Sequence, residues 1–148
     1  MKIIIASDSH GNNKVLDEIA LKHQDADIFL HAGDSEMDEY MIMPFETVLG
    51  NCDHFSNAPI RKIIDTPMGK LLLQHYPTIP EDIIEQYHIK FFVHGHTHRR
   101  ENIKKKGLVI LCPGSISFDR DGNDLSYMEL IVSKDDYEVI FRSLLEEK

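Results

Sequence analysis

Short apolar runs that each stop at a cluster of polar side chains recur along this sequence, and they constrain its fold most. The runs lie within the segments 2–6, 27–31, 46–49 and 90–93, each of which begins with a charged residue. The clusters that follow them are Asp8-Ser9-His10, Gly33-Asp34, Gly50-Asn51-Cys52-Asp53 and Gly95-His96-Thr97-His98. Apolar runs of this length are typical of buried strands, and the first run, at the N-terminus of the chain, is also rich in β-branched residues. We therefore expect the polar clusters at the carboxyl ends of strands.

The segments between these runs indicate an α/β fold. Asn12 or Asn13 can cap a helix whose apolar residues recur at helical spacing from Val15 to Ala20, so the first two strands form a βαβ unit with a parallel sheet. The turn at 66–69 contains Pro67 and Gly69 and predicts a hairpin between strands at 60–65 and 70–75. A short helix is expected from Pro80 to Tyr87.

The C-terminal third has a different pattern, with no segment of helix length. From residue 101, strands alternate with turns at Lys105-Lys106-Gly107, Asp121-Gly122-Asn123 and Lys134-Asp135-Asp136. This pattern predicts a meander that closes a second sheet. The length of 148 residues fits one domain, which we place at 1–148.

Composition and charge exclude several classes of function. Lysine and arginine total 16 against 25 aspartate and glutamate, and the net charge of −9 argues against nucleic-acid or membrane partners. The N-terminal apolar run is too short for a signal peptide, and no other segment reaches the length of a membrane span. Cys52 and Cys112 are 60 positions apart and indicate no disulfide framework. A cytoplasmic location is expected.

The residue types in the clusters indicate a metal centre. Nine histidines are present, five of them between His75 and His98, and the carboxyl ends of parallel strands meet at one edge of a sheet. The candidate ligands are Asp8, His10, Asp34, Asn51, His75, His96 and His98. They offer nitrogen and oxygen without thiolate, which suits Mn, Fe, Co, Ni or Zn. Seven ligands exceed the need of one tetrahedral ion, so two ions that share a carboxylate are expected.

The order of these motifs resembles that of the calcineurin-like metallophosphoesterases. That family's signature is D-x-H, then G-D, then G-N-H-D, then a lone histidine, then G-H-x-H. The corresponding residues here are Asp8-Ser9-His10, Gly33-Asp34, Gly50-Asn51-Cys52-Asp53, His75 and Gly95-His96-Thr97-His98. The Pro113-Gly114-Ser115 stretch is also similar to small bacterial and archaeal members of the YfcE type.

The resemblance implies a fold, an activity and roles for the ligands. The fold would be a four-layer α/β/β/α sandwich of two mixed sheets, and the activity hydrolysis of a small phosphate ester, most simply a phosphodiester, by a metal-bridging hydroxide. Two divalent transition-metal ions are implied, with Mn favoured. One ion would be held by Asp8, His10 and His98, the other by Asn51, His75 and His96, with Asp34 as the bridge. Asp34 and Asn51 are the implied catalytic residues.

Cys52 departs from the family pattern, because the catalytic histidine of G-N-H-D stands at that position. His54 is one candidate for the missing proton donor, and a metal-bound water with His54 as an ordinary loop residue is the alternative. A scaffold or binding module, like the related retromer subunit, is the competing function. The metallo-β-lactamase pattern, H-x-H-x-D-H after an early strand, does not occur here. The physiological substrate, the native metal and the oligomeric state, including a homo-oligomer, stay open.

Other residues near the motifs carry two interpretations. His31 and His94 are either hydrogen-bond partners of the ligands or packed strand residues. The pair Arg99-Arg100 either contacts a substrate phosphate or lies in a solvated loop. His23 and His88 are expected at the surface near helix ends.

Overall fold

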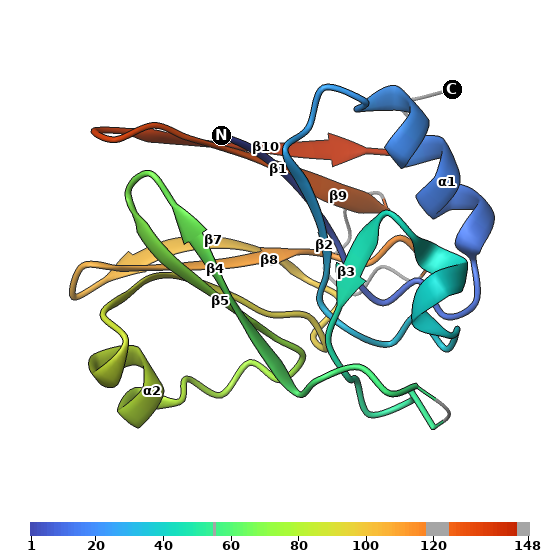
Figure 1. The fold of residues 1–148 in the computed structure, drawn as a ribbon, viewed down its shortest axis with the longest axis horizontal. Helices are drawn as coiled ribbons and strands as arrows, with labels where there is room; N and C mark the ends of the chain where they lie inside the picture. Colours follow the sequence, from blue (N-terminus) through green and yellow to red (C-terminus); the bar gives the residue numbers. More distant parts are fainter. Residues whose placement is uncertain (55, 118–124, 145–148) are drawn as a thin grey trace.

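The structure is a computed structural model that describes residues 1–54, 56–117 and 125–144. In these residues two five-stranded sheets lie face to face (Figure 1). The first sheet has the order β10-β9-β1-β2-β3, with strands β1 (Lys2–Ala6), β2 (Ile28–His31), β3 (Phe45–Thr47), β9 (Ser126–Val132) and β10 (Tyr137–Ser143). The second has the order β4-β5-β6-β8-β7, with strands β4 (Arg61–Thr66), β5 (Gly69–Gln74), β6 (Ile89–Val93), β7 (Arg100–Lys105) and β8 (Leu108–Pro113).

Both sheets are mixed. In the first, β1, β2 and β3 are parallel, and β9 runs antiparallel to β1. In the second, β5, β6 and β8 are parallel, and the edge strands β4 and β7 are antiparallel to their neighbours. The parallel strands of each sheet therefore deliver their carboxyl ends to a common edge.

Helices cover the outer faces. Helix α1 (Asn13–Lys22) and the 3₁₀ helix η1 (Glu39–Ile42) lie on the first sheet, and α2 (Glu81–Gln86) lies on the second. The predicted cap is confirmed, since Asn12 Oδ1 accepts the Val15 N–H at 3.4 Å. The order of layers is helix, sheet, sheet, helix, which confirms the expected four-layer α/β/β/α sandwich. No helix in the described residues is long and apolar enough to cross a membrane.

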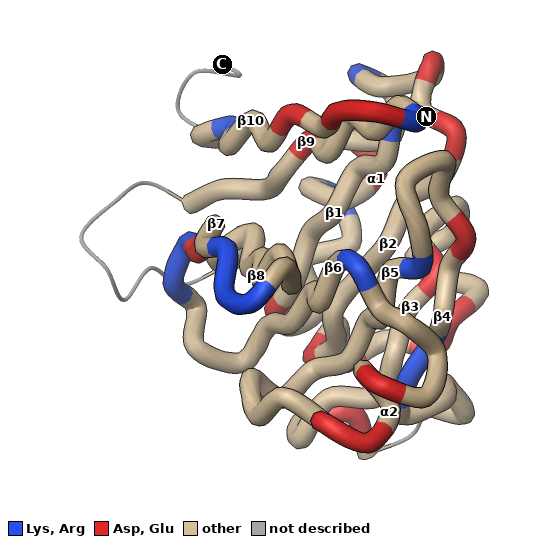
Figure 2. Tube along the Cα trace, turned by 90° about the vertical axis from the view of Figure 1, so that its left-hand side faces the viewer, with Lys and Arg blue, Asp and Glu red and all other residues tan. Residues whose placement is uncertain are grey.

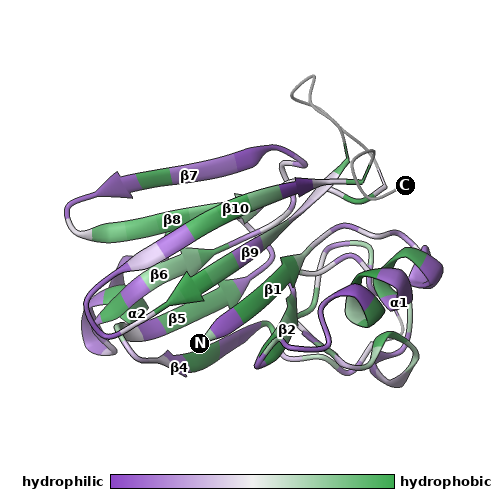
Figure 3. Ribbon diagram, turned by 90° about the horizontal axis from the view of Figure 1, so that it is seen from above, coloured by the Kyte–Doolittle hydropathy of each residue, from purple (hydrophilic) through white to green (hydrophobic). Residues whose placement is uncertain are grey.

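The main core fills the space between the sheets. Ile3 and Ile5 of β1 point into it, opposite Leu71 and Leu73 of β5, and all four side chains are fully buried. Ile4 lies on the other face of β1, against α1. Successive strand residues alternate between faces, so a strand buried on both faces is a continuous apolar run. Figure 3 shows this contrast, with β1 and β8 apolar and the edge strand β7 largely polar.

The C-terminal third corrects the prediction of one meander closing a second sheet. Strands β7 and β8 join the second sheet, but β9 and β10 form the far edge of the first. Strand β8 is buried along most of its length and pairs parallel with β6, whereas β7 exposes its lysines at the hairpin tip (Figure 2). The apolar strand β8 occupies the inner position and the polar β7 the edge, because burying the apolar side chains of β8 stabilises the fold. The predicted turn at 121–123 lies outside the described residues.

The expected surface position of His23 is wrong, while His88 is exposed as expected. His23 is 6% exposed, and its Nε2 lies 2.7 Å from the hydroxyl of the buried Tyr127. The C-terminus of α1 packs close to β9, so a histidine just after the helix meets a polar partner inside the protein.

Candidate metal centre

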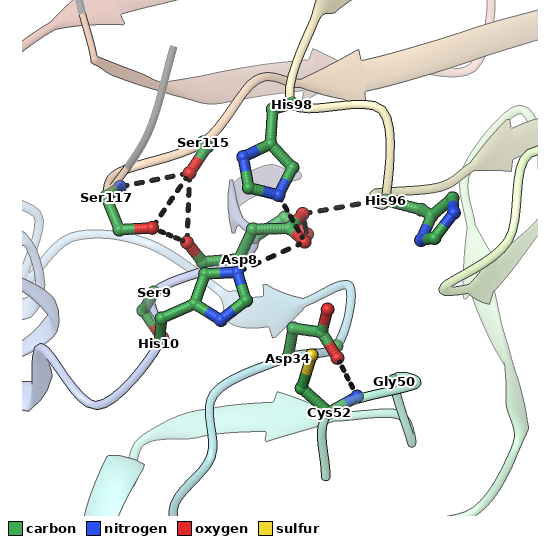
Figure 4. A network of polar contacts seen from close by, with 12 residues as sticks. Asp8, Ser9, His10, Asp34, Gly50, Cys52, His96, His98, Ser115 and Ser117 are labelled. Atoms are coloured by element: carbon green, nitrogen blue, oxygen red, sulfur yellow. Dashed lines mark hydrogen bonds and ion pairs between the residues drawn. The ribbon is translucent and has the colours of Figure 1, made fainter. Parts of the chain in front are cut away.

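The seven predicted ligands meet where the carboxyl ends of the two sheets come together. They come from both sheets, not from one edge of a single sheet. The loops after β1, β2 and β3 supply Asp8, His10, Asp34 and Asn51, and the loops after β5 and β6 supply His75, His96 and His98. Backbone hydrogen bonds connect neighbouring loops, such as Asp8 N–H to Gly33 O at 3.0 Å and Gly95 N–H to His75 O at 3.0 Å. Figure 4 shows part of this convergence.

Asp8, His10 and His98 form the first cluster. Asp8 Oδ1 lies 3.3 Å from His98 Nε2 and 4.0 Å from His10 Nε2. The ligand atoms of all three residues lie within 4.8 Å of one another. This is the set that the resemblance assigns to one ion.

Asn51, His75 and His96 form the second cluster. His75 Nε2 lies 2.8 Å from Asn51 Oδ1 and 3.2 Å from His96 Nδ1, and His96 Nδ1 lies 3.2 Å from Asn51 Oδ1. His75 Nδ1 donates to Ala32 O at 2.8 Å, so that its Nε2 is directed at the cluster. Three nitrogen and oxygen atoms thus converge on one point.

Asp34 lies between the two clusters. Its Oδ2 is 3.3 Å from His75 Nε2, and its ligand atom lies within 4.8 Å of those of Asp8 and His75. Its Oδ1 accepts the backbone N–H of Cys52 at 2.8 Å. The carboxylate therefore touches the second cluster and faces the first, which is the place expected of a bridge.

The donor atoms fit divalent metal ions. Asp8 is fully buried, and among the described residues its Oδ1 has no donor in good hydrogen-bond geometry, although His98 Nε2 lies 3.3 Å away. A buried carboxylate oxygen without a well-aligned donor is costly, and a cation facing it would offset that cost. The set of imidazole, carboxylate and amide groups suits ions of intermediate softness.

The backbone at these positions is unusual. Asp8, His10, Asp34, His96 and His98 all have positive φ, between 45° and 68°. Residues other than glycine rarely adopt this left-handed region, and such strain clusters at functional sites. Five of the seven predicted ligands share it, which indicates that the loops are shaped by the site.

Two motif glycines leave room for carboxylates. A Cβ at Gly50 would clash with the backbone and side chain of Asp34, and one at Gly95 would clash with Ser7 Oγ and lie 2.8 Å from Asp8 Oδ2. Neither glycine has a positive φ. Glycine is therefore required there for close approach, not for its conformation.

Electrostatics keep the carboxylates charged. Burial alone would raise the pKa of Asp34, but His75 and the Cys52 N–H outweigh it and lower that pKa to about 2. Burial also opposes ionisation of Asp8, yet His98 and Ser7 hold its pKa below the usual value. Both groups are thus ionised at neutral pH and ready to bind a cation.

His31 and His94 support the loops around the clusters. Burial lowers the pKa of His31 to about 4, so the ring is neutral; its Nδ1 accepts the Gly33 N–H at 3.1 Å, and its Nε2 lies 2.9 Å from Ser9 Oγ. His94 Nε2 lies 2.6 Å from Glu101 Oε1. In the described residues neither ring hydrogen-bonds a predicted ligand, so the interpretation of both as packed, buried residues is the one that the structure supports. Their contacts stabilise the segments next to the ligand loops.

Cys52 presents a neutral thiol beside the clusters. Burial first, and then the nearby carboxylates of Asp34 and Glu36, raise its pKa. A nucleophilic thiolate is therefore disfavoured, as the acidic sequence around it predicts. His54 is exposed and lines, with Glu36, Met41 and Cys52, a hollow of about 390 Å³.

Two carboxylates near the clusters are missing from the ligand prediction. Glu36 Oε2 lies 2.9 Å from His10 Nδ1. Asp53 accepts the backbone N–H groups of Asp34, Glu36 and Gly50 at 2.8–2.9 Å, and so holds two loops together. The place of Asp53 in Gly50-Asn51-Cys52-Asp53 is the one sequence signal for its role.

Serines after β8 also support the first cluster. Ser115 Oγ and Ser117 Oγ both donate to the backbone carbonyl of Asp8, at 2.9 and 2.6 Å (Figure 4). Of the Arg99-Arg100 pair, Arg100 donates from Nε to Ser126 Oγ at 2.9 Å. This contact, away from the clusters, favours a structural role for Arg100.

Comparisons with known proteins agree with this arrangement. The chain is 28% identical over 146 residues to probable metallophosphoesterase YsnB of Bacillus subtilis (strain 168), which covers 91% of this chain and 86% of that protein. A crystal structure of an uncharacterized protein from Streptococcus pneumoniae TIGR4, described as a predicted phosphoesterase, superposes with a TM-score of 0.87 at 23% identity, covering 96% of this chain and 88% of the other. Vps29 of Entamoeba histolytica, complexed with Zn²⁺, superposes with a TM-score of 0.77 at 18% identity, covering 100% and 95%.

A family model extends the match along most of the sequence. The model of the calcineurin-like phosphoesterase superfamily domain matches residues 1–135, a range that contains all seven predicted ligands. With its helix-sheet-sheet-helix fold and two facing ligand clusters, the chain belongs to the calcineurin-like phosphoesterase superfamily.

Proposed function

We propose that this chain is a binuclear-metal phosphodiesterase that hydrolyses a small phosphate ester. The observation that carries the proposal is the convergence of all seven nitrogen and oxygen ligands in two clusters joined by Asp34. Asp8, His10 and His98 would hold one ion, Asn51, His75 and His96 the other. When bound, two such ions neutralise phosphate charge and lower the pKa of water, so that hydroxide is available at neutral pH.

The chain's own residues position the reactants. Asp34 has a pKa of about 2 and stays ionised across the neutral range, so it is a permanent anionic bridge. Asn51 directs Oδ1 at His75 and His96, and its amide nitrogen lies 3.5 Å from Cys52 Sγ. Because the residue is exposed, we expect this nitrogen to be able to donate to a phosphoryl oxygen as well. These contacts support the assignment of Asp34 and Asn51 as catalytic residues.

The cysteines and the net charge support a proposed cellular location and a proposed class of partners. Both cysteines are free, which suits the reducing cytoplasm. The net charge of −9 disfavours nucleic acid and anionic membranes as partners and leaves small phosphate esters as the simplest substrates.

A scaffold function is the second candidate. Cys52 in place of a proton-donating imidazole favours it, and so does the likeness of the fold to Vps29. The complete ligand set favours the enzyme, because a scaffold has no need of seven converging ligands.

The test is hydrolysis by the purified chain after chelation and reconstitution with Mn²⁺, Ni²⁺ or Mg²⁺. Bis-p-nitrophenyl phosphate and p-nitrophenyl phosphate report diesterase and monoesterase activity. We expect diester hydrolysis that Mn²⁺ or Ni²⁺ supports better than Mg²⁺, since imidazole ligands favour them. His75→Ala should abolish it, and His88→Ala, at an exposed histidine, should not. Activity that survives chelation, or no activity with any metal, would contradict the proposal.

A further inference from the structure

A small hollow opens beside the second cluster. It has a volume of about 170 Å³, and His75 lines one wall of it. Ile60, Arg61 and Tyr76 line other parts. His75 Nε2 faces Asn51 and Asp34, so His75 belongs both to the lining of this hollow and to the second cluster.

Tyr76 presents an aromatic ring at the edge of this hollow. It follows His75 directly, and its ring centroid lies 5.0 Å from that of His96 and 5.3 Å from that of His75. The side chain is nevertheless 47% exposed. The ring is therefore held against two predicted ligands and still offers aromatic surface to a bound molecule.

Arg61 adds a positive charge, and a buried glutamine fixes its position. Arg61 Nε donates to Gln74 Oε1 at 2.8 Å, and Gln74 is 4% exposed. Gln74 Nε2 in turn donates to the carbonyls of Tyr76 and Thr78 at 2.7 and 2.9 Å. One buried amide thus orders both the guanidinium and the backbone that carries Tyr76.

Arg61 also lacks an acidic partner. In the part of the chain that the structure describes, no carboxylate lies within 4.0 Å of its guanidinium, although acidic residues outnumber basic ones by 25 to 16. The remaining nitrogens of the guanidinium are available to an acceptor or an anion.

We propose that this hollow binds an aromatic arm of the substrate, an aryl or nucleobase ring that carries neutral or anionic substituents. Tyr76 supplies the ring contact and Arg61 selects against positive charge. The volume of about 170 Å³ is well below the roughly 300–1,000 Å³ of sites that enclose whole ligands, so it accommodates one ring. The inference rests on the proposed function, because it names the substrate class of the same site.

Phosphonates test the hollow without catalysis, because their carbon–phosphorus bond is not hydrolysed. Calorimetry on the Mn²⁺-loaded chain compares phenylphosphonate with methylphosphonate. Partial burial of a phenyl ring predicts that the first binds about tenfold more tightly. Tyr76→Ala should reduce this ratio to about twofold and Tyr76→Phe should keep it. Tyr87→Ala, at an exposed tyrosine outside the hollow, is the matched control.

The charge preference is measured with substituted rings. The native chain should bind 4-carboxyphenylphosphonate about tenfold more tightly than 4-(aminomethyl)phenylphosphonate, and Arg61→Gln should bring the two affinities close together. Lys62→Gln, next to Arg61 on β4, controls for a general change of surface charge.

The outcomes separate the two proposals. A chain that hydrolyses no diester but still prefers phenylphosphonate would refute the enzyme and retain the binding site. Equal affinity for phenyl- and methylphosphonate, binding of neither, or a ratio that Tyr76→Ala leaves unchanged would overturn the inference. If Tyr76→Ala does not fold or bind metal, Ile60→Ser at a 62% exposed position gives the same test.

Discussion

Glu36 Oε2 lies 2.9 Å from His10 Nδ1, so this carboxylate determines which ring nitrogen of His10 faces the first cluster. When Nδ1 carries the proton, Nε2 keeps its lone pair, and this atom faces Asp8, whose Oδ1 lies 4.0 Å away. The backbone N–H of Glu36 donates to Asp53 Oδ1 at 2.8 Å, which keeps the Glu36 backbone in place. A carboxylate behind a metal-binding histidine fixes its tautomer and makes it a better ligand.

Glu36→Ala should therefore weaken metal binding. Loss of such a partner typically costs 10–100-fold in affinity. Competition with a chromophoric chelator measures it, and Asp38→Ala, at an exposed acid of the same loop, should have little effect. Equal affinities for Glu36→Ala and the native chain would show that Glu36 does not orient His10.

Replacing Asp34 should change the number of ions bound. Asp34 lies between the two clusters, so we expect about two ions per native chain after reconstitution and at most one in Asp34→Asn. Elemental analysis gives the ratio of metal to protein. Two ions per chain in Asp34→Asn would show that Asp34 is not needed to hold the two ions together.

Gly95→Ala should disturb the first cluster through Ser7. A Cβ at residue 95 would clash with Ser7 Oγ, which donates to Asp8 Oδ2. We expect a lower melting temperature and weaker metal binding, since overpacking typically costs about 1–3 kcal/mol. Removing the hydroxyl in the double variant Ser7→Ala/Gly95→Ala should restore part of the stability. A single variant as stable as the native chain would contradict the steric argument.

Where the information is local, the sequence predicts the strands well, and it also predicts that the polar residues at their ends converge. The run at 2–6 is apolar on both faces because β1 lies between α1 and the second sheet. A continuous apolar run of this kind can be recognised as a buried strand from the sequence alone. The predicted ligands are polar residues at strand ends, and their order matches that of one family. Pairing of β8 with β6 and of β9 with β1 depends on distant residues, so a pattern of strands and turns could not assign them to different sheets.

The supporting residues of the site are harder to predict for the same reason. Asp53 acts through backbone groups of Asp34 and Glu36, 19 and 17 positions away, and no spacing rule links them. Arg61 and Tyr76 share a hollow because β4 and β5 pair antiparallel, which places Arg61 opposite Gln74. Such contacts follow from the register of the sheet.

Glu129 should make stability depend on pH. It is 3% exposed on β9 and pairs with Arg142 and with Lys2 at 3.2 Å. Burial alone would raise its pKa, but these cations lower it below the usual value of 4.5. A lowered folded-state pKa stabilises the protein above the unfolded-state pKa, and this contribution is lost as pH falls through the folded-state pKa.

Glu129→Gln should therefore lower the melting temperature at pH 7 and have less effect at an acidic pH below the folded-state pKa of Glu129, where the native carboxyl is protonated. Because Lys2 and Arg142 are partly exposed, we expect a loss of about 1–2 kcal/mol in the free energy of unfolding at pH 7. Glu138→Gln, at an exposed residue of β10, is the control. The same loss at both pH values would refute the ionic contribution.

Cys52 presents a neutral thiol at the position where the family signature has a proton-donating histidine. Its raised pKa makes it a poor acid at neutral pH. Protonation of the leaving oxygen typically contributes about 10²–10⁴-fold, and p-nitrophenolate needs that proton far less than an alkoxide. The native chain should therefore hydrolyse aryl diesters much faster than alkyl diesters. The hollow beside Tyr76 is expected to change the affinity for aryl substrates. The aryl and alkyl diesters are therefore compared by their kcat values at saturating substrate.

Cys52→His should narrow the gap between aryl and alkyl leaving groups, because an imidazole at this position can donate the proton. Cys52→Gln, which adds bulk without a titratable group, should not narrow it. Metal content is matched in all three proteins, since the neighbouring Asn51 is a predicted ligand. A native chain with no aryl preference would mean that another residue already donates the proton, and His54, on the same hollow as Cys52, is the first to substitute.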